Sequence, residues 1–399
     1  MSRAIEHPPS QRPVIQFSNA VTYSEFPGHN FLVAFPTLTD LLDLRVRKIG
    51  VPLTDSSRSN LILDPILCTN RDEYLARPTL PAAFHSWGPH EGEGEDEAEP
   101  RVLSGRDAQA GGTWLGLTPT SGRIALLTNI TETPQNFPSS RGALPSTFLS
   151  AAAPRMPLQG MYALDGQYAG FNMLLLEGVW DNNKQISFVD ASILSNDGGG
   201  KPLAFRPLRP DERALGGLSN GIHVGGVAGE AWPKVVNGRT LFAAVVAEHD
   251  ETKRAFAAED AKRVNEEADD EELASRLFAL LRTTAPNPPR AREELRQTIC
   301  VEPIEIPTTA NGDGRVLTPK YYATRTATVL LVRRTGEAFF VERDVWRLKA
   351  DTPGGVHLYV DGKVGCDRTR NGAARAGDGE RVFRVRLGER LPAAAAAGT

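Results

Sequence analysis

The stretch LILDPILCTNRDEYLARP, residues 61–78, joins an apolar segment of strand length to a compact group of charged side chains. The aliphatic residues from Leu61 to Cys68 predict a strand, and Pro65 within it predicts an edge position or a bulge. After Thr69, the strand leads into Asn70, Arg71, Asp72 and Glu73. Because a strand fixes the groups at its end, we expect this edge to face a cleft.

The bulk composition is that of a soluble globular protein. The chain has 399 residues, of which 40% are hydrophobic and 24% charged, enough for one large domain or two ordinary ones. Its formal net charge of −4 lacks the basic excess of nucleic-acid-binding proteins, so no nucleic-acid partner is expected. The 37 glycines and 29 prolines favour many short strands over a helical bundle.

Cysteine and histidine spacing indicates neither a disulfide framework nor a metal site. Cys68, Cys300 and Cys366 lie far apart and form no CxxC pair, so a reducing compartment is the simplest interpretation. The seven histidines show no HxxxH or HExxH spacing, and we therefore predict no protein-ligated metal.

The sequence predicts a cytoplasmic chain. No apolar stretch reaches membrane-spanning length, and residues 1–16 have the pattern of neither a signal peptide nor a transit peptide. Any association with an organelle such as the Golgi or a mitochondrion would therefore be peripheral.

Hairpins and two helical regions follow the opening stretch. Strand pairs are expected at 102–117 with 123–130, at 168–176 with 185–189, and at 326–332 with 338–343, the last turned at Thr335-Gly336. Short strands are expected at 356–360 and 381–387. Helices are expected from Ser140 onward and over 235–282, where apolar residues recur at helical spacing.

Three segments fit this pattern poorly. Residues 1–60 are rich in proline, with a short strand expected at 31–35 and a short helix at 38–46, and the rest partly disordered. The acidic run 91–99 predicts a surface loop, and the Ala-rich end predicts a disordered tail over 389–399.

A series of short motifs in order along the chain resembles the transport and Golgi organisation 2 family, also called the NRDE-domain family. The matching pieces include 70–73 with 77–78, 105–107 with 112–116, 127–129, 140–142, 170–172, 218–220, 232–234, 324–326 and 342–343. The resemblance covers roughly residues 61–345. It implies a single NRDE-type domain over 61–388, with inserts at 88–100 and 247–272.

The resemblance also implies a fold. This is an α+β, N-terminal-nucleophile-hydrolase-like αββα arrangement, in which two stacked antiparallel sheets are flanked by helices. Hydrolases of that type attack an amide with the side chain of their first residue, whose α-amine is the base. Relatives usually begin Met-Cys and lead straight into the first strand, whereas this chain begins Met1-Ser2. No catalytic residue is therefore assigned, and residues 1–60 are interpreted as an alternative or misjudged start that replaces the family's first strand.

Twelve residues form the candidate pocket. They are Asn70, Arg71, Asp72, Glu73, Arg77, Arg106, Asp107, Gly112, Thr113, Trp114, Asn129 and Asn220. Arg71 and Asp72 point in opposite directions if the strand continues, so only one of them is expected to face a given pocket. The alternative is structural: the charged members, from Arg71 to Asp107, form an ion-pair network that ties the sheet edge to the Gly112-Thr113-Trp114 hairpin.

Three functions remain open. The resemblance implies a role in Golgi organisation and protein secretion, with haem or acyl-lipid handling through a small-molecule or lipid ligand. The fold analogy suggests an amide or thioester hydrolase, against which the missing N-terminal Cys argues. The third is a non-catalytic peripheral scaffold whose acidic inserts meet basic partners.

Overall fold

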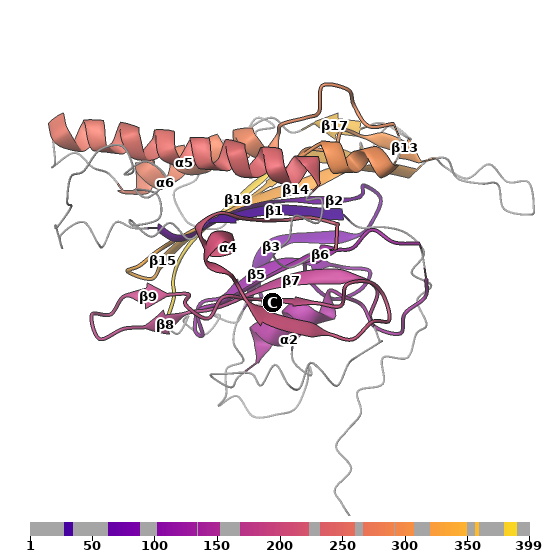
Figure 1. Ribbon diagram of the computed structural model, residues 1–399, viewed down its shortest axis with the longest axis horizontal. Helices are drawn as coiled ribbons and strands as arrows, with labels where there is room; N and C mark the ends of the chain where they lie inside the picture. The colour runs from indigo at the N-terminus through magenta and orange to yellow at the C-terminus, as the bar shows by residue number, and fades with distance from the viewer. Residues whose placement is uncertain are drawn as a thin grey trace, which may run out of the picture.

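The computed structural model describes residues 28–34, 63–87, 102–133, 135–151, 168–222, 232–259, 266–290, 292–306, 320–348, 356–358 and 379–388. Two large antiparallel sheets dominate this α+β structure (Figure 1). The first sheet has the order β12-β1-β2-β14-β15-β18, with β13 also paired to β14. Its strands are β1 (Gly28–Ala34), β2 (Leu63–Tyr74), β12 (Gly216–Leu218), β13 (Ile304–Ile306), β14 (Lys320–Arg333), β15 (Glu337–Asp344) and β18 (Glu380–Arg386).

The second sheet has the order β11-β10-β7-β6-β5-β4-β3. Its strands are β3 (Thr79–His85), β4 (Val102–Asp107), β5 (Leu115–Thr118), β6 (Arg123–Asn129), β7 (Phe171–Glu177), β10 (Ser192–Ser195) and β11 (Ala204–Pro207). Two small ribbons pair β8 (Val179–Trp180) with β9 (Ile186–Ser187), and β16 (Trp346–Leu348) with β17 (Val356–Leu358). The helices are α2 (Ala143–Ser150), α4 (Pro210–Ala214), α5 (Pro233–Glu259), α6 (Glu266–Leu281) and the 3₁₀ helix η2 (Arg292–Gln297).

Three hydrophobic clusters hold these elements in layers. Phe242 of α5 and Leu277 of α6 pack on the outer face of the first sheet, and Phe148 of α2 packs on the outer face of the second. Between the sheets, Leu67 and Phe340 meet Leu117 from the other side. The order is therefore helices, sheet, sheet, helix, as Figure 1 shows.

Strand β2 is central rather than at an edge, which corrects one of the two expectations drawn from Pro65. It lies between β1 and β14. Pro65 is tolerated because the pairing with β1 ends at Ile66, and the register with β14 shifts between Leu331 and Arg333, opposite this end of β2. The bulge expectation is confirmed.

Most sequence-predicted elements are present. The strand expected at 31–35 is β1, and the 326–343 hairpin and both late strands are found. The pairing of 168–176 with 185–189 is wrong: β7 pairs with β6 and β10, and Ile186 pairs instead with Trp180. Described residues of the expected insert at 247–272 extend α5 and begin α6. The expected helix at 38–46, the acidic run 91–99 and the tail 389–399 lie outside the described residues.

No helix within the described ranges combines the length and the apolar character needed to cross a membrane.

A partly buried carboxylate joins the two long helices. Asp269 of α6 lies 3.0 Å from Nε2 of His249 and is ion-paired with Lys253, both on α5. Burial raises the pKa of Asp269, but the contacts with His249 and Lys253 outweigh it and lower the pKa to about 2. A carboxyl group whose pKa is lower in the folded state stabilises the fold above its unfolded pKa.

We expect Asp269→Asn to lower the free energy of unfolding by about 2 kcal/mol at pH 7. The deficit should shrink as the pH falls from about 4 toward 2, because the wild-type carboxylate is then protonated too. Urea unfolding at pH 7 and pH 3 measures it. Glu272→Gln, which removes the exposed pair with Arg276 on the same helix, is the control and should change stability by less than about 0.5 kcal/mol. A deficit of the control's size would contradict the role of Asp269.

Candidate functional site

The polar end of β2 lies where the chain leaves the first sheet and enters the second. Residues 75–78 make this crossing, and β3 begins at Thr79. A cavity of about 250 Å³ opens here, lined by residues of both sheets, of α5 and of connecting loops. Nine of the twelve candidate residues line it: Arg71, Asp72, Glu73, Arg77, Asp107, Thr113, Trp114, Asn129 and Asn220.

Side chains along β2 alternate between the helical layer and the second sheet. Asn70 points to the helices, where its amide donates to the carbonyls of Leu281 (2.8 Å) and Ile299 (3.0 Å). It ties α6 to the sheet and does not belong to the cavity lining. Asp72 is on the same face as Asn70, and its Oδ1 accepts a 2.6 Å hydrogen bond from the Thr324 hydroxyl.

Arg71 and Glu73 point the other way, yet Arg71 and Asp72 line the same cavity. The expectation that only one of them could do so is wrong, because the cavity lies at the sheet edge and extends to both faces. Lys234 of α5 borders it on the helical side, and Trp114 borders it on the side of the second sheet.

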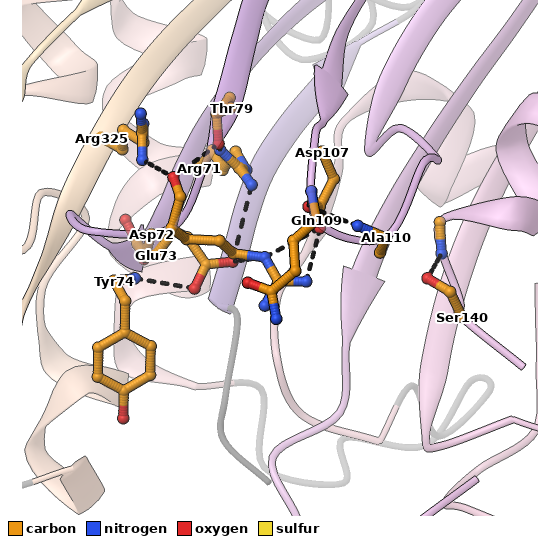
Figure 2. A network of polar contacts seen from close by, with 12 residues as sticks. Arg71, Asp72, Glu73, Tyr74, Thr79, Asp107, Gln109, Ala110, Ser140 and Arg325 are labelled. Carbon is orange, nitrogen blue, oxygen red and sulfur yellow. Dashed lines mark hydrogen bonds and ion pairs between the residues drawn. The ribbon is translucent and has the colours of Figure 1, made fainter. Parts of the chain in front are cut away.

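An ion-pair chain crosses between the sheets. Glu73 is 3.5 Å from Nε of Arg77, and Arg77 donates to Oδ2 of Asp107 from both Nε (2.9 Å) and Nη2 (2.7 Å). Figure 2 shows this group, with Tyr74 donating its backbone N–H to Glu73 and Asp107 accepting from the backbone of Gln109 and Ala110. Asp107 thereby connects β4 to the end of β2.

Arg71 is buried among charged, polar and aromatic groups. Its guanidinium stacks on the Trp114 ring at 3.9 Å, donates to the Thr79 hydroxyl at 2.8 Å, and approaches Glu73 at 3.7 Å. Burial lowers the pKa of Arg71, and burial also raises the pKa of Glu73 in spite of the arginines beside it. Each buried charge therefore depends on its partners.

The structural network inferred from the sequence includes four of its six expected members. Asp72 faces Thr324 instead, on the opposite face of β2. Arg106 does not line the cavity, and its guanidinium lies 5.8 Å from the Trp87 ring. Asp72 and Arg106 lie outside the network because successive side chains of a strand point to opposite faces of the sheet. Grouping charged residues by their nearness in the sequence does not take this alternation into account.

Gly111 and Gly112 are glycines for different reasons. Gly111 has φ +81°, and a Cβ there would meet no atom within 4 Å. At Gly112 a Cβ would lie 2.3 Å from the carbonyl carbon of Gly142, in the loop before α2. This close approach lets Thr113 donate its N–H to the Gly142 carbonyl at 3.1 Å. Gly112 itself does not line the cavity. Its close approach to Gly142 helps to position Thr113, which does line the cavity.

We therefore expect Gly112→Ala to destabilise the protein by roughly 2–3 kcal/mol or more, because two backbone segments would have to separate. Gly111→Ala is the matched neighbour and should lose only about 1 kcal/mol, the strain of a positive φ. Thermal or urea unfolding of both variants provides the comparison. Equal losses would show that the contact with Gly142 does not constrain this turn.

Asn129 and Asn220, both candidate pocket residues, contact one another. Nδ2 of Asn220 donates to the Asn129 carbonyl at 2.8 Å, and the Asn220 carbonyl accepts from Thr131. Asn220 thus fastens the loop after β12 to the end of β6. One of its amide hydrogens is used within the protein.

Lys234 is the functional candidate that sequence reasoning missed. Only 3% of this residue is exposed, it lines the cavity, and burial lowers the pKa of its ammonium to about 8, with the Asp72 charge opposing that shift. It is the second residue of α5, whose first turn carries no acid. A lysine in the first turn of a helix is disfavoured by the positive end of the helix dipole. This unfavourable position of Lys234, within the motif 232–234, is the feature of the sequence that could have identified it as a functional candidate.

No thiol lines the described cavity. Cys68 is packed between β2 and the helices, and burial raises the pKa of its thiol. Burial, followed by the charge of Asp72, raises the pKa of Cys300 to about 12. Ser2 lies outside the described residues.

Comparison with known proteins shows the family of this chain. The family model described as "Transport and Golgi organisation 2" matches residues 56–347, more than half of the chain. The chain belongs to the Transport and Golgi organisation 2 family. The match includes every candidate site residue and begins after β1, so the strand beside β2 comes from outside the matched range.

Related proteins cover most of the chain. The Transport and Golgi organization protein 2 homolog of Bos taurus is 28% identical over 285 residues, 70% of this chain and 86% of the relative. The corresponding Mus musculus protein is 27% identical over 286 residues, again 70% and 86%. An uncharacterized protein of Saccharomyces cerevisiae is 26% identical over 320 residues, 74% of this chain and 92% of the relative.

Proposed function

We propose that the cavity binds a small acyl compound, and that this chain serves transport and Golgi organisation as an acyl-ligand-binding protein. The observation that carries the proposal is the mixed lining of the cavity. It includes the polar side chains of Asp72, Asn129, Asn220 and Lys234. It also includes the largely apolar side chains of Ile130, Phe137, Leu295, Ile304, Ile306 and Tyr322.

An acyl compound would match this mixture of polar and apolar lining residues. Its hydrocarbon chain would lie against Ile304 and Ile306, while its carbonyl group would reach the buried polar groups at the end of β2. The volume of about 250 Å³ is near the small end of ligand pockets, which span roughly 300–1,000 Å³. Short and medium acyl chains are therefore the best match.

A hydrolase acting on the same acyl amides or thioesters is the second candidate. The helix, sheet, sheet, helix order supports an N-terminal-nucleophile-hydrolase-like fold, and Asp72, Asn129 and Asn220 border one cavity. A nucleophile would also have to be present. We therefore rank binding above turnover.

The described wall does not suit haem. No His, Cys or Met is among the described residues that line the cavity, and these are the side chains that most often ligate haem iron. The described ranges also hold no group of three or more His, Cys, Asp or Glu placed to bind a metal.

Ile304→Asn should weaken binding of octanoyl compounds by roughly tenfold, because it places an amide on the apolar wall. Isothermal titration with octanoate, octanamide and an octanoyl thioester measures the affinity, and release of the thiol from the thioester reports hydrolysis. Glu305→Asn is the matched control, since Glu305 points away from the cavity on the same strand.

Saturable binding of at least one octanoyl compound is expected, with the control unchanged. If none binds, or if both variants behave like wild type, the proposed function is wrong. Thiol release abolished by Asp72→Asn would instead favour the hydrolase.

A further inference from the structure

The Lys234 ammonium has no polar partner among the described residues. Its Nζ makes no hydrogen bond and no ion pair within 4 Å with any of them, and it lies 5.2 Å from the centroid of the Trp232 ring. The side chain is nevertheless 97% removed from solvent and lines the cavity. A charge so placed is costly unless something in the cavity compensates it.

The arginines on β2 and in the crossing loop contrast with Lys234. Arg77 donates two hydrogen bonds to Asp107, and Arg71 approaches Glu73 while stacking on Trp114. Their charge is already balanced within the protein. Of these three cavity-lining cations, Lys234 is the one with no described carboxylate within ion-pair distance, and a fourth lining cation, Arg141, donates to the Gly170 carbonyl.

The start of α5 adds to the positive character of this corner. The helix begins at Pro233 and is 27 residues long, so the positive end of its dipole lies beside Lys234. A lysine at this position destabilises the free helix terminus, and an anion bound there would relieve both effects at once. The unpartnered buried ammonium and the helix start thus indicate the same kind of ligand.

We propose that Lys234, together with the first turn of α5, binds the carboxylate of an acyl ligand, so that the cavity selects acyl carboxylates over the corresponding neutral amides. This inference rests on the proposed acyl-binding function and specifies its head group. Lys234 is thus a specificity-determining residue, and no covalent step is involved.

Asp72 moderates this preference. Its Oδ1 is held by Thr324, and its charge is felt by Lys234 without an ion pair between them. The Asp72 carboxylate therefore repels a bound anion while helping to keep Lys234 protonated. The Lys234 pKa of about 8 leaves the ammonium as the main form at neutral pH.

The test measures octanoate and octanamide binding at pH 7 by isothermal titration to the full chain and to three variants. Wild type should bind octanoate more tightly than octanamide. Lys234→Met should lose roughly ten- to a hundredfold in octanoate affinity and little in octanamide affinity, since a charge-assisted hydrogen bond is removed. Lys234→Arg should retain the preference for octanoate.

Asp72→Asn should tighten octanoate binding by roughly three- to tenfold, because it removes a nearby negative charge while keeping an oxygen for Thr324. A merely structural Lys234 would weaken both ligands equally in the Met variant. Equal affinities of wild type for octanoate and octanamide would overturn the inference and leave the acyl-binding function standing. Failure of both ligands to bind would overturn the acyl-binding function itself.

Discussion

The buried Glu73 carboxylate at the sheet crossing is the constraint on which the site depends. Only 1% of Glu73 is exposed, and its charge is balanced by Arg77 and Arg71. Arg77 in turn holds Asp107, so one ion-pair chain fixes the end of β2 against β4 in the other sheet. Arg325 of β14 adds hydrogen bonds to the carbonyls of Leu75 and Arg77 within the crossing loop. A crossing fixed at so many points holds the cavity walls in place before any ligand arrives.

Strand β2 can serve this purpose because both of its faces are covered. Cys68 and Asn70 face the helices, and Leu67 and Arg71 face the second sheet. At the end of the strand this alternation places Asp72 and Glu73 on opposite faces of the same edge. The two carboxylates therefore have different surroundings. Glu73 belongs to the ion-pair chain that joins the sheets, whereas Asp72 lines the cavity, where its charge acts on Lys234. The conspicuous four-residue motif is therefore partly scaffold and partly pocket wall.

Much of the fold could be predicted from local patterns. The strand before Asn70, the 326–343 hairpin and the helical spacing over 235–282 all have short-range causes in apolar periodicity and turn residues. The pairing of β7 could not be predicted in this way. The same alternation of side chains along the strand is compatible with a tight local hairpin and with a pairing to β6 and β10. The sequence likewise could not show that β1, from a proline-rich segment, lies beside β2, since that pairing depends on contacts about forty residues apart. Lys234 was missed for a related reason. Residues 72 and 234 are far apart in the sequence, and only the tertiary fold brings Asp72 and Lys234 close enough for their charges to interact.

A crystal structure of the chain with octanoate tests the central claim most directly. The account predicts that the carboxylate lies within hydrogen-bonding distance of Lys234 Nζ at the start of α5, with the hydrocarbon chain against Ile304 and Ile306. An octanoate bound elsewhere, or one in this cavity whose carboxylate points away from Lys234, would contradict it.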